Sequence, residues 1–178
     1  PTPDARRPTP DARRPTPDAL IPSSLLRHIP RMSPSPRPAP WDVRRRRGAP
    51  PLVVVADDDP VVAALAKAAI EAEGWDAVVA ADAMQAVMFT VRSAPAAVVL
   101  DIQMPAGSGV HVLRKLRSNA KTADIPVVVL TGSTDPTLPD EVRALGAAAF
   151  LRKPLDPDAL RDALRDAIAA TSDDGPVA

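Results

Sequence analysis

The 178-residue chain contains no cysteine and no tyrosine, and only two phenylalanines and two tryptophans. The lack of cysteine excludes disulfide bonds, thiolate metal sites and a cysteine nucleophile, and it fits a chain that works in the cytoplasm. Because aromatic residues make up only 2% of the chain, the core must be built mainly from aliphatic side chains. No apolar run approaches the roughly 20 residues that a membrane-spanning helix needs, so no membrane association is expected.

Acidic residues are scarce at the N-terminus, although the formal net charge of the whole chain is zero. Residues 1–51 contain 11 of the 22 Lys and Arg residues but only 4 of the 22 Asp and Glu residues, so their net charge is +7 and that of residues 52–178 is −7. The same segment holds 14 of the 23 prolines and opens with the repeat PTPDARR. Because proline removes backbone donors and fixes φ, residues 1–50 are predicted to form a disordered Pro- and Arg-rich tail. The chain starts with Pro1, so it is either processed or a fragment, and Met32 is an alternative start.

From Leu52 onwards, short apolar runs alternate with segments of helical pattern. Continuous apolar runs are typical of strands that are buried on both faces of a parallel sheet. Five strand–helix repeats therefore predict a doubly wound α/β sandwich over residues 51–170, followed by a polar C-terminal tail at 171–178. The predicted strands are 52–56, 77–81, 96–100, 127–130 and 148–151, and the predicted helices are 60–73, 83–92, 109–118, 139–146 and 156–170.

Several helix boundaries carry their own signals. Asp59 is a good N-cap with Pro60 at the first helical position, and Gly74 can end that helix. In the same way, Asp82 can cap the second helix and Gly146 can end the fourth.

Polar side chains follow four of the five predicted strands. Asp57 and Asp58 come after the first strand, Asp101 after the third, Thr131 after the fourth and Lys153 after the fifth. In a parallel sheet these residues gather at one edge, outside the carboxyl ends of the strands, where ligands bind. Carboxylate oxygens suit Mg²⁺, and an ammonium with a hydroxyl suits phosphoryl oxygens. The set predicts a site that binds Mg²⁺ and moves a phosphoryl group.

Four segments of the chain, VVVADDDP, VVLDIQMPAGSG, VVVLTGS and GAAAFLRKP, closely resemble the receiver domain of two-component response regulators. They occur in the family's order, and the separations of 30 residues from Asp101 to Thr131 and 22 from Thr131 to Lys153 also match. The resemblance covers about residues 51–170. It implies a CheY-like, flavodoxin-like (βα)5 fold with the strand order 2-1-3-4-5.

The resemblance also implies how a phosphoryl group would be accepted. Asp101 is expected to attack phosphohistidine on a histidine kinase or phosphotransfer protein and to become an aspartyl phosphate. Thr131 would hydrogen-bond the phosphoryl group, and Lys153 would form an ion pair with it. A cis peptide bond between Lys153 and Pro154 would aim the lysine.

The resemblance assigns the metal site to Asp57, Asp58, Asp101 and the backbone carbonyl of Gln103. A divalent cation between the carboxylates explains why adjacent like charges are tolerated in ADDDP. Asp59 is expected to serve only as the helix cap.

The signalling part of the resemblance rests on Thr131 and Phe150. Phosphorylation would draw Thr131 inward and let Phe150 rotate, which would remodel the face formed by the fourth helix, fifth strand and fifth helix. A downstream protein, and a second copy of the chain, are the expected partners at that face. Pro136 and Pro139 depart from the family and are predicted to shorten the fourth helix, and Ser108 stands where the family often has Asp.

Other functions stay open at this point. A haloacid-dehalogenase-like phosphatase would use Asp57 as its nucleophile in an Asp57-x-Asp59 pattern, although the cap and final acidic pair of that family are absent. A degenerate receiver could serve only as a scaffold. No segment after residue 170 is long enough for an output domain, so nucleic acid is not an expected partner. The run Arg44–Arg47 is expected to be solvated, and contact with nucleic acid or with an acidic surface is the alternative. The basic tail as a whole could also fold back over the acidic site and compete with Mg²⁺.

Overall fold

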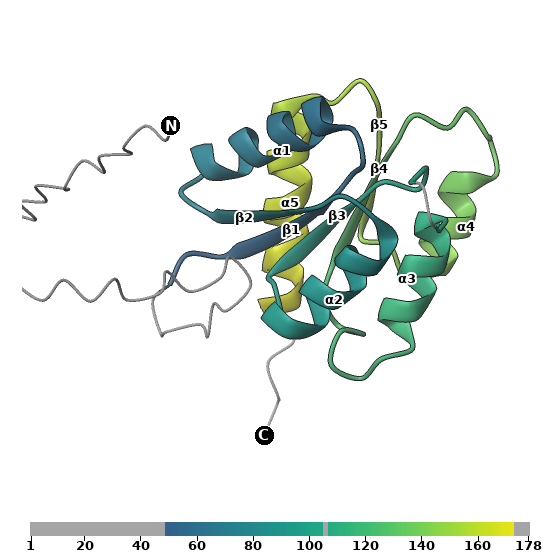
Figure 1. The fold of residues 1–178 in the computed structure, drawn as a ribbon, viewed down its shortest axis with the longest axis horizontal. Coiled ribbons are helices and arrows are strands. Elements are labelled where there is room, and N and C mark those ends of the chain that lie inside the picture. The colour runs from purple at the N-terminus through teal and green to yellow at the C-terminus, as the bar shows by residue number, and fades with distance from the viewer. Residues whose placement is uncertain (1–48, 105–106, 173–178) are drawn as a thin grey trace, which may run out of the picture. The chain divides into compact units, whose positions relative to one another are not determined.

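The computed structural model describes residues 49–104 and 107–172, in which five strands and five helices alternate (Figure 1). All neighbouring strands are parallel, and their order is β2-β1-β3-β4-β5. The predicted doubly wound fold and strand order are confirmed. The elements are β1 (Leu52–Ala56), α1 (Pro60–Ala72), β2 (Asp76–Ala80), α2 (Ala83–Ser93), β3 (Ala97–Leu100), α3 (Gly109–Arg117), β4 (Val127–Thr131), α4 (Leu138–Ala144), β5 (Ala149–Arg152) and α5 (Pro157–Ser172).

The boundaries agree with the sequence to within two residues. The α4 helix has only seven residues, as the two prolines near its start predicted, whereas α5 has 16 and continues to Ser172. Nearly all of the predicted tail, residues 1–48, and residues 173–178 lie outside the described part of the chain. Within the described part, no helix is long and apolar enough to cross a membrane.

The predicted helix caps form as hydrogen bonds. The Asp59 carboxylate accepts from the backbone N–H groups of Val61 and Val62 at 2.8 and 3.4 Å, and the Asp82 carboxylate accepts from the Gln85 N–H at 2.7 Å. These bonds satisfy backbone donors that have no partner inside their own helix. The sharp start of α1 is what turns the chain away from the sheet directly after β1.

The sheet is covered on both faces, and its side chains alternate between two aliphatic clusters. On β1, Val53 and Val55 pack with α1 and α5, whereas Val54 and Ala56 pack with α2, α3 and α4. Figure 1 shows the same division, with α1 and α5 on one side of the strands and the other three helices on the opposite side. Because both faces of the inner strands are buried, β1 and β3 are apolar along their whole length, and their polar neighbours Asp57 and Asp101 lie beyond the strand ends.

Candidate functional site

Two buried aspartates stand at the carboxyl end of the sheet, where β1 and the adjacent β3 finish. Asp57 and Asp101 are each only 3% exposed. They are held in the same way: Asp57 Oδ1 accepts the Asp59 N–H at 3.0 Å, and Asp101 Oδ1 accepts the Gln103 N–H at 2.9 Å. A side-chain oxygen that bonds the backbone two residues later fixes the carboxylate without help from other elements. In both residues this leaves Oδ2 free to face the centre of the site.

Lys153 brings a positive charge to these carboxylates from the end of β5. Its Nζ donates a hydrogen bond to Asp101 Oδ2 at 2.7 Å, and it lies 2.8 Å from Asp57 Oδ2. The side chain is 19% exposed. Its backbone N–H donates to the Thr131 carbonyl at 2.9 Å, and the Lys153–Pro154 peptide bond is cis. One ammonium therefore serves two buried carboxylates.

The shared ammonium does not satisfy Asp57 fully. Its contact with Asp57 Oδ2 has the distance of an ion pair but not the angles of a hydrogen bond, and among the described residues this buried oxygen has no hydrogen-bond partner. Burial raises the pKa of the Asp57 carboxyl above its ordinary value of 3.8, although Lys153 and the Asp59 N–H act in the opposite direction. Burial also tends to lower the pKa of Lys153, but its hydrogen bond to Asp101 and its close charge contact with Asp57 outweigh this effect and raise the pKa. The site thus holds two buried carboxylates close together with a single ammonium between them.

A third carboxylate completes an acidic cluster that fits a divalent cation. Asp57, Asp58 and Asp101 each offer one oxygen, and these oxygens lie within 4.8 Å of one another. Asp58 is exposed, whereas the other two are buried, so the cluster opens toward solvent on one side. Hard oxygen ligands from a few carboxylates, with room left for water, are the environment that Mg²⁺ prefers. The unsatisfied Asp57 Oδ2 gives such an ion a ready ligand.

The hydroxyl and aromatic residues lie on the two strands beside this cluster. Thr131 is fully buried at the end of β4, and its Oγ1 accepts the Ser133 N–H at 3.2 Å. Phe150 is half-buried on β5 and packs against the cluster of α2, α3 and α4. The Arg152 guanidinium lies 5.6 Å from the centre of the Phe150 ring and donates to the Ser133 carbonyl at 2.9 Å. Arg152, which the sequence did not single out, thereby links the aromatic ring to the loop after β4.

Gly109 is a second residue that sequence reasoning missed. A Cβ atom at this position would lie 2.1 Å from the backbone oxygen of Asp101 and 2.7 Å from the Cα of Ile102. The start of α3 therefore packs directly on the backbone that carries Asp101, and only glycine fits. A glycine in the first turn of a helix, where it is a poor helix former, was the available signal. Ser108 caps this helix, since its hydroxyl accepts the Val110 N–H at 3.2 Å.

Comparison with known proteins gives one consistent result. The family model of the response regulator receiver domain matches residues 53–165. The transcriptional regulatory protein FixJ of Azorhizobium caulinodans is 40% identical over 78 residues, which cover 44% of this chain and 36% of FixJ. The chain therefore spans about a third of the length of that relative.

Solved structures agree on the fold. A CheY-like receiver domain protein from Methanospirillum hungatei JF-1 superposes with a TM-score of 0.67 at 20% identity, covering 71% of this chain and 100% of that one. The receiver domain of the sensor histidine kinase PA1611 from Pseudomonas aeruginosa has a TM-score of 0.63 at 23% identity, covering 68% and 99%. That domain has a magnesium ion coordinated in its active site cleft.

Proposed function

The chain belongs to the response regulator receiver domain family, and from this premise we propose that it is a phosphorylation-controlled switch whose phosphoacceptor is Asp101. The observation that carries the proposal is the environment of the Asp101 carboxylate. It is buried, one of its oxygens is fixed by the Gln103 N–H, and the other is hydrogen-bonded to Lys153. A carboxylate that is held still beside a cation is suited to attack phosphorus and to have the product's charge neutralised.

The reaction moves one phosphoryl group between two nucleophiles. An oxygen of Asp101 forms a bond to the phosphorus of phosphohistidine on a histidine kinase or phosphotransfer protein, and the bond from phosphorus to the imidazole nitrogen breaks. The imidazole leaves with its electron pair and takes up a proton. Lys153 then pairs with a phosphoryl oxygen, and the Thr131 hydroxyl turns from the Ser133 N–H to donate to another. Water attack on the aspartyl phosphate resets the switch.

The acidic cluster gives the reaction its metal site. Asp57, Asp58 and Asp101, with the backbone carbonyl of Gln103, would hold Mg²⁺ there. When bound, the ion neutralises charge on the phosphoryl oxygens. The magnesium ion coordinated in the cleft of the PA1611 receiver domain supports this assignment. In this role Lys153 keeps two buried carboxylates together before the ion arrives.

The output face is proposed to be the surface of α4, β5 and α5. Inward movement of Thr131 would shift the loop that begins at Ser133, and this loop is bonded to Arg152, which in turn lies over the ring of Phe150. Rotation of Phe150 would change the edge strand β5 and its contact with α4. A downstream protein, or a second copy of the chain as a homodimer, would bind the altered face.

Intact-mass measurement after incubation with acetyl phosphate and Mg²⁺ tests the proposal. We expect the native chain to gain one phosphoryl group, and we expect the gain to vanish in Asp101→Asn and in the presence of EDTA. Peptide mapping of the modified chain separates this function from a phosphatase that uses the β1 aspartate, because the phosphoryl group should lie on Asp101 and not on Asp57. Asp57→Asn should lower the gain, since it removes a proposed Mg²⁺ ligand, but should leave the modified residue the same. A phosphoryl group that persists in Asp101→Asn would contradict the proposal. No gain from acetyl phosphate or from a histidine kinase, together with no beryllofluoride binding, would favour a scaffold.

A further inference from the structure

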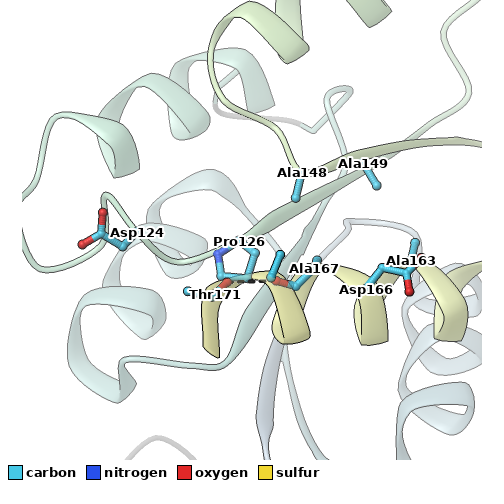
Figure 2. Close-up of a pocket in the computed structure, with 9 residues that line it drawn as sticks. Asp124, Pro126, Ala148, Ala149, Ala163, Asp166, Ala167 and Thr171 are labelled. Atoms are coloured by element: carbon cyan, nitrogen blue, oxygen red, sulfur yellow. Dashed lines mark hydrogen bonds between the residues drawn. The ribbon is translucent and has the colours of Figure 1, made fainter. Parts of the chain in front are cut away.

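A groove opens at the amino end of the sheet, opposite the acidic cluster. It has a volume of about 1050 Å³ and runs between the C-terminal half of α5 and the starts of β4 and β5 (Figure 2). Small side chains form its walls, because Ala148 and Ala149 face Ala163 and Ala167 across the opening. Because these side chains are small, they leave room in the groove for the larger side chains of a bound segment.

The groove carries negative charge at its borders. Asp124 lies in the loop before β4, and Asp166 lies on α5; both are exposed, and neither forms a salt bridge among the described residues. Arg117 is a nearby cation and interacts with Asp124, but its guanidinium is occupied by the carbonyl oxygens of Ala123, Ile125 and Gly146. Among residues 49–104 and 107–172, Asp166 thus lacks a partner charge, and Asp124 is only partly compensated by Arg117. The groove is therefore matched to a basic ligand.

The basic tail reaches the described domain at this same end of the sheet. The tail leads into β1 at Leu52, whose carbonyl accepts the N–H of Ala96, just before β3, at 2.7 Å. On the other side of β3, the Val98 N–H donates to the carbonyl of Pro126, just before β4, at 2.9 Å. The starts of β1, β3 and β4 are therefore side by side. A smaller cavity of about 280 Å³, lined by Ala96 and Pro126 among others, lies between this point and the groove. It shares Asp124, Pro126 and Thr171 with the groove, so the two form one path.

The distances allow the four consecutive arginines at 44–47 to follow this path. Neighbouring strands lie about 4.8 Å apart, so the starts of β4 and β5 are about 10 and 14 Å from the start of β1. Residues 49–51 are placed by the structure, and the Pro51 carbonyl accepts the Asp76 N–H of β2 at 2.8 Å, so the reach is counted from Ala49. Arg44 precedes Ala49 by five residues, and five extended residues span at most about 17 Å. This reach allows the first arginines of the run to approach the groove, and their effective concentration there is high because they are part of the same chain.

We propose that the segment containing Arg44–Arg47 binds this alanine-lined groove, with its guanidinium groups paired to Asp124 and Asp166. Arginine suits the site because its guanidinium forms bidentate bonds to carboxylates and its apolar stem can cover alanine side chains. The tail then lies on the surface of α5 and β5 rather than over the acidic cluster at the other end. This inference is independent of whether Asp101 accepts a phosphoryl group.

Paramagnetic broadening in the full chain tests the proposal directly. The chain has no cysteine, so Val43→Cys provides a single site for a nitroxide beside the arginines. We expect the amide signals of Ala149, Ala163 and Ala167 to broaden at least about twofold more than those of Met84 and Met88 on the other face. The difference should disappear between about 10 mM and 1 M salt, as the Debye length falls from about 30 to about 3 Å.

Matched variants separate specific binding from a general attraction between opposite charges. Arg44–Arg47→Gln should abolish the selective broadening, whereas replacing Arg6, Arg7, Arg13 and Arg14 by Gln removes the same charge and should leave it intact. In the groove, Asp124→Asn with Asp166→Asn should abolish it. Asp140→Asn with Asp162→Asn should not, because those carboxylates are bonded to Arg143 and Arg165.

Four results would overturn the proposal. The first is uniform broadening over the domain, which means that the tail has no fixed site. The second is broadening centred on Asp57, Asp58 and Asp101, which means that the tail covers the acidic cluster. The third is broadening of an isotope-labelled chain by a separate spin-labelled chain, which assigns the groove to a second copy. The fourth is selective broadening that survives both charge-removing variants.

Discussion

Both ends of the sheet carry a pair of aspartates, but the pair is buried at the carboxyl end and exposed at the amino end. At the carboxyl end, Asp57 and Asp101 are 3% exposed and share the ammonium of Lys153. At the amino end, Asp124 and Asp166 are exposed at the borders of a groove lined by alanine. Burial raises the pKa of Asp57 and leaves the first pair in need of a cation, whereas solvent screens the second pair. The acidic cluster at the carboxyl end is thus distinguished by charge that is withdrawn from water, whereas the groove at the amino end keeps its charge in solvent.

The largest effect should come from Gly109, which packs against the backbone of the site. In Gly109→Ala the new Cβ atom would lie 2.1 Å from the Asp101 carbonyl oxygen. This clash cannot be relieved by a rotamer change, because the atom that would have to move belongs to the backbone. We expect the free energy of unfolding, measured in urea, to fall by at least about 3 kcal/mol. Gly132→Ala is the matched control, because its Cβ atom would contact only Gln103 Oε1 at 3.6 Å. Equal stability of the two variants would contradict the close packing.

Removal of the shared cation should have the next largest effect. Lys153→Met leaves Asp57 and Asp101 close together without a counter-charge. A fully buried pair that loses one partner costs 3 to 5 kcal/mol; because Lys153 is partly exposed and the carboxyls can bind protons, we expect about 2 kcal/mol at neutral pH in EDTA. Mg²⁺ should restore most of this loss, and calorimetry should show tighter Mg²⁺ binding than in the native chain. Weaker Mg²⁺ binding in the variant would show that Lys153 does not compete with the ion.

Replacement of Asp57 should make the metal-free protein more stable. The pKa of Asp57 is raised in the folded state, so the folded protein binds its proton more tightly than the unfolded chain does. The stability contributed by this group therefore decreases as pH rises from below 3.8 through the raised pKa, and above that value the full penalty applies. Asp57→Asn should remove the penalty and gain about 1–2 kcal/mol at pH 7 in EDTA, with less gain at pH 3.

The amino end of the sheet supplies the control for that prediction. Asp166→Asn removes the same charge from an exposed position, so its effect on the free energy of unfolding should stay within about 0.5 kcal/mol at both pH values. If both variants gave the same pH dependence of the melting temperature, the difference between the two ends of the sheet would be refuted.

The smallest effect should come from the separate roles of Asp58 and Asp59, which belong to the acidic cluster and to the helix cap respectively. Asp59→Ala removes the cap of α1 and should lower the free energy of unfolding by about 1 kcal/mol, while Mg²⁺ affinity changes little. Asp58→Asn should do the reverse, because Asp58 is exposed and belongs to the acidic cluster. Urea unfolding and Mg²⁺ titration of both variants check this. A large loss of Mg²⁺ binding in Asp59→Ala would place the third aspartate in the metal site.

The sequence by itself determined the strands, the helix starts and the end of the sheet at which the polar residues gather. Apolar runs such as Leu52–Ala56 are short and rich in valine, which favours strands buried on both faces, and caps such as Asp59 and Asp82 act on backbone within three residues. These are local effects of hydrophobicity and hydrogen bonding, so they can be predicted from neighbouring residues in the sequence. The strand order came from the resemblance to a family rather than from the residues alone.

Only the tertiary structure decided how these parts meet. Lys153 reaches Asp101 across 52 residues of sequence, and nothing local reveals that it also touches Asp57 without satisfying it. The tight contact of Gly109 with the Asp101 backbone, and the bonds from Arg152 to the loop after β4, likewise join elements that are separate in sequence. The physical reason is that burial, shared charge and steric fit depend on distances between segments, and folding sets those distances only when the sheet and its helices pack together.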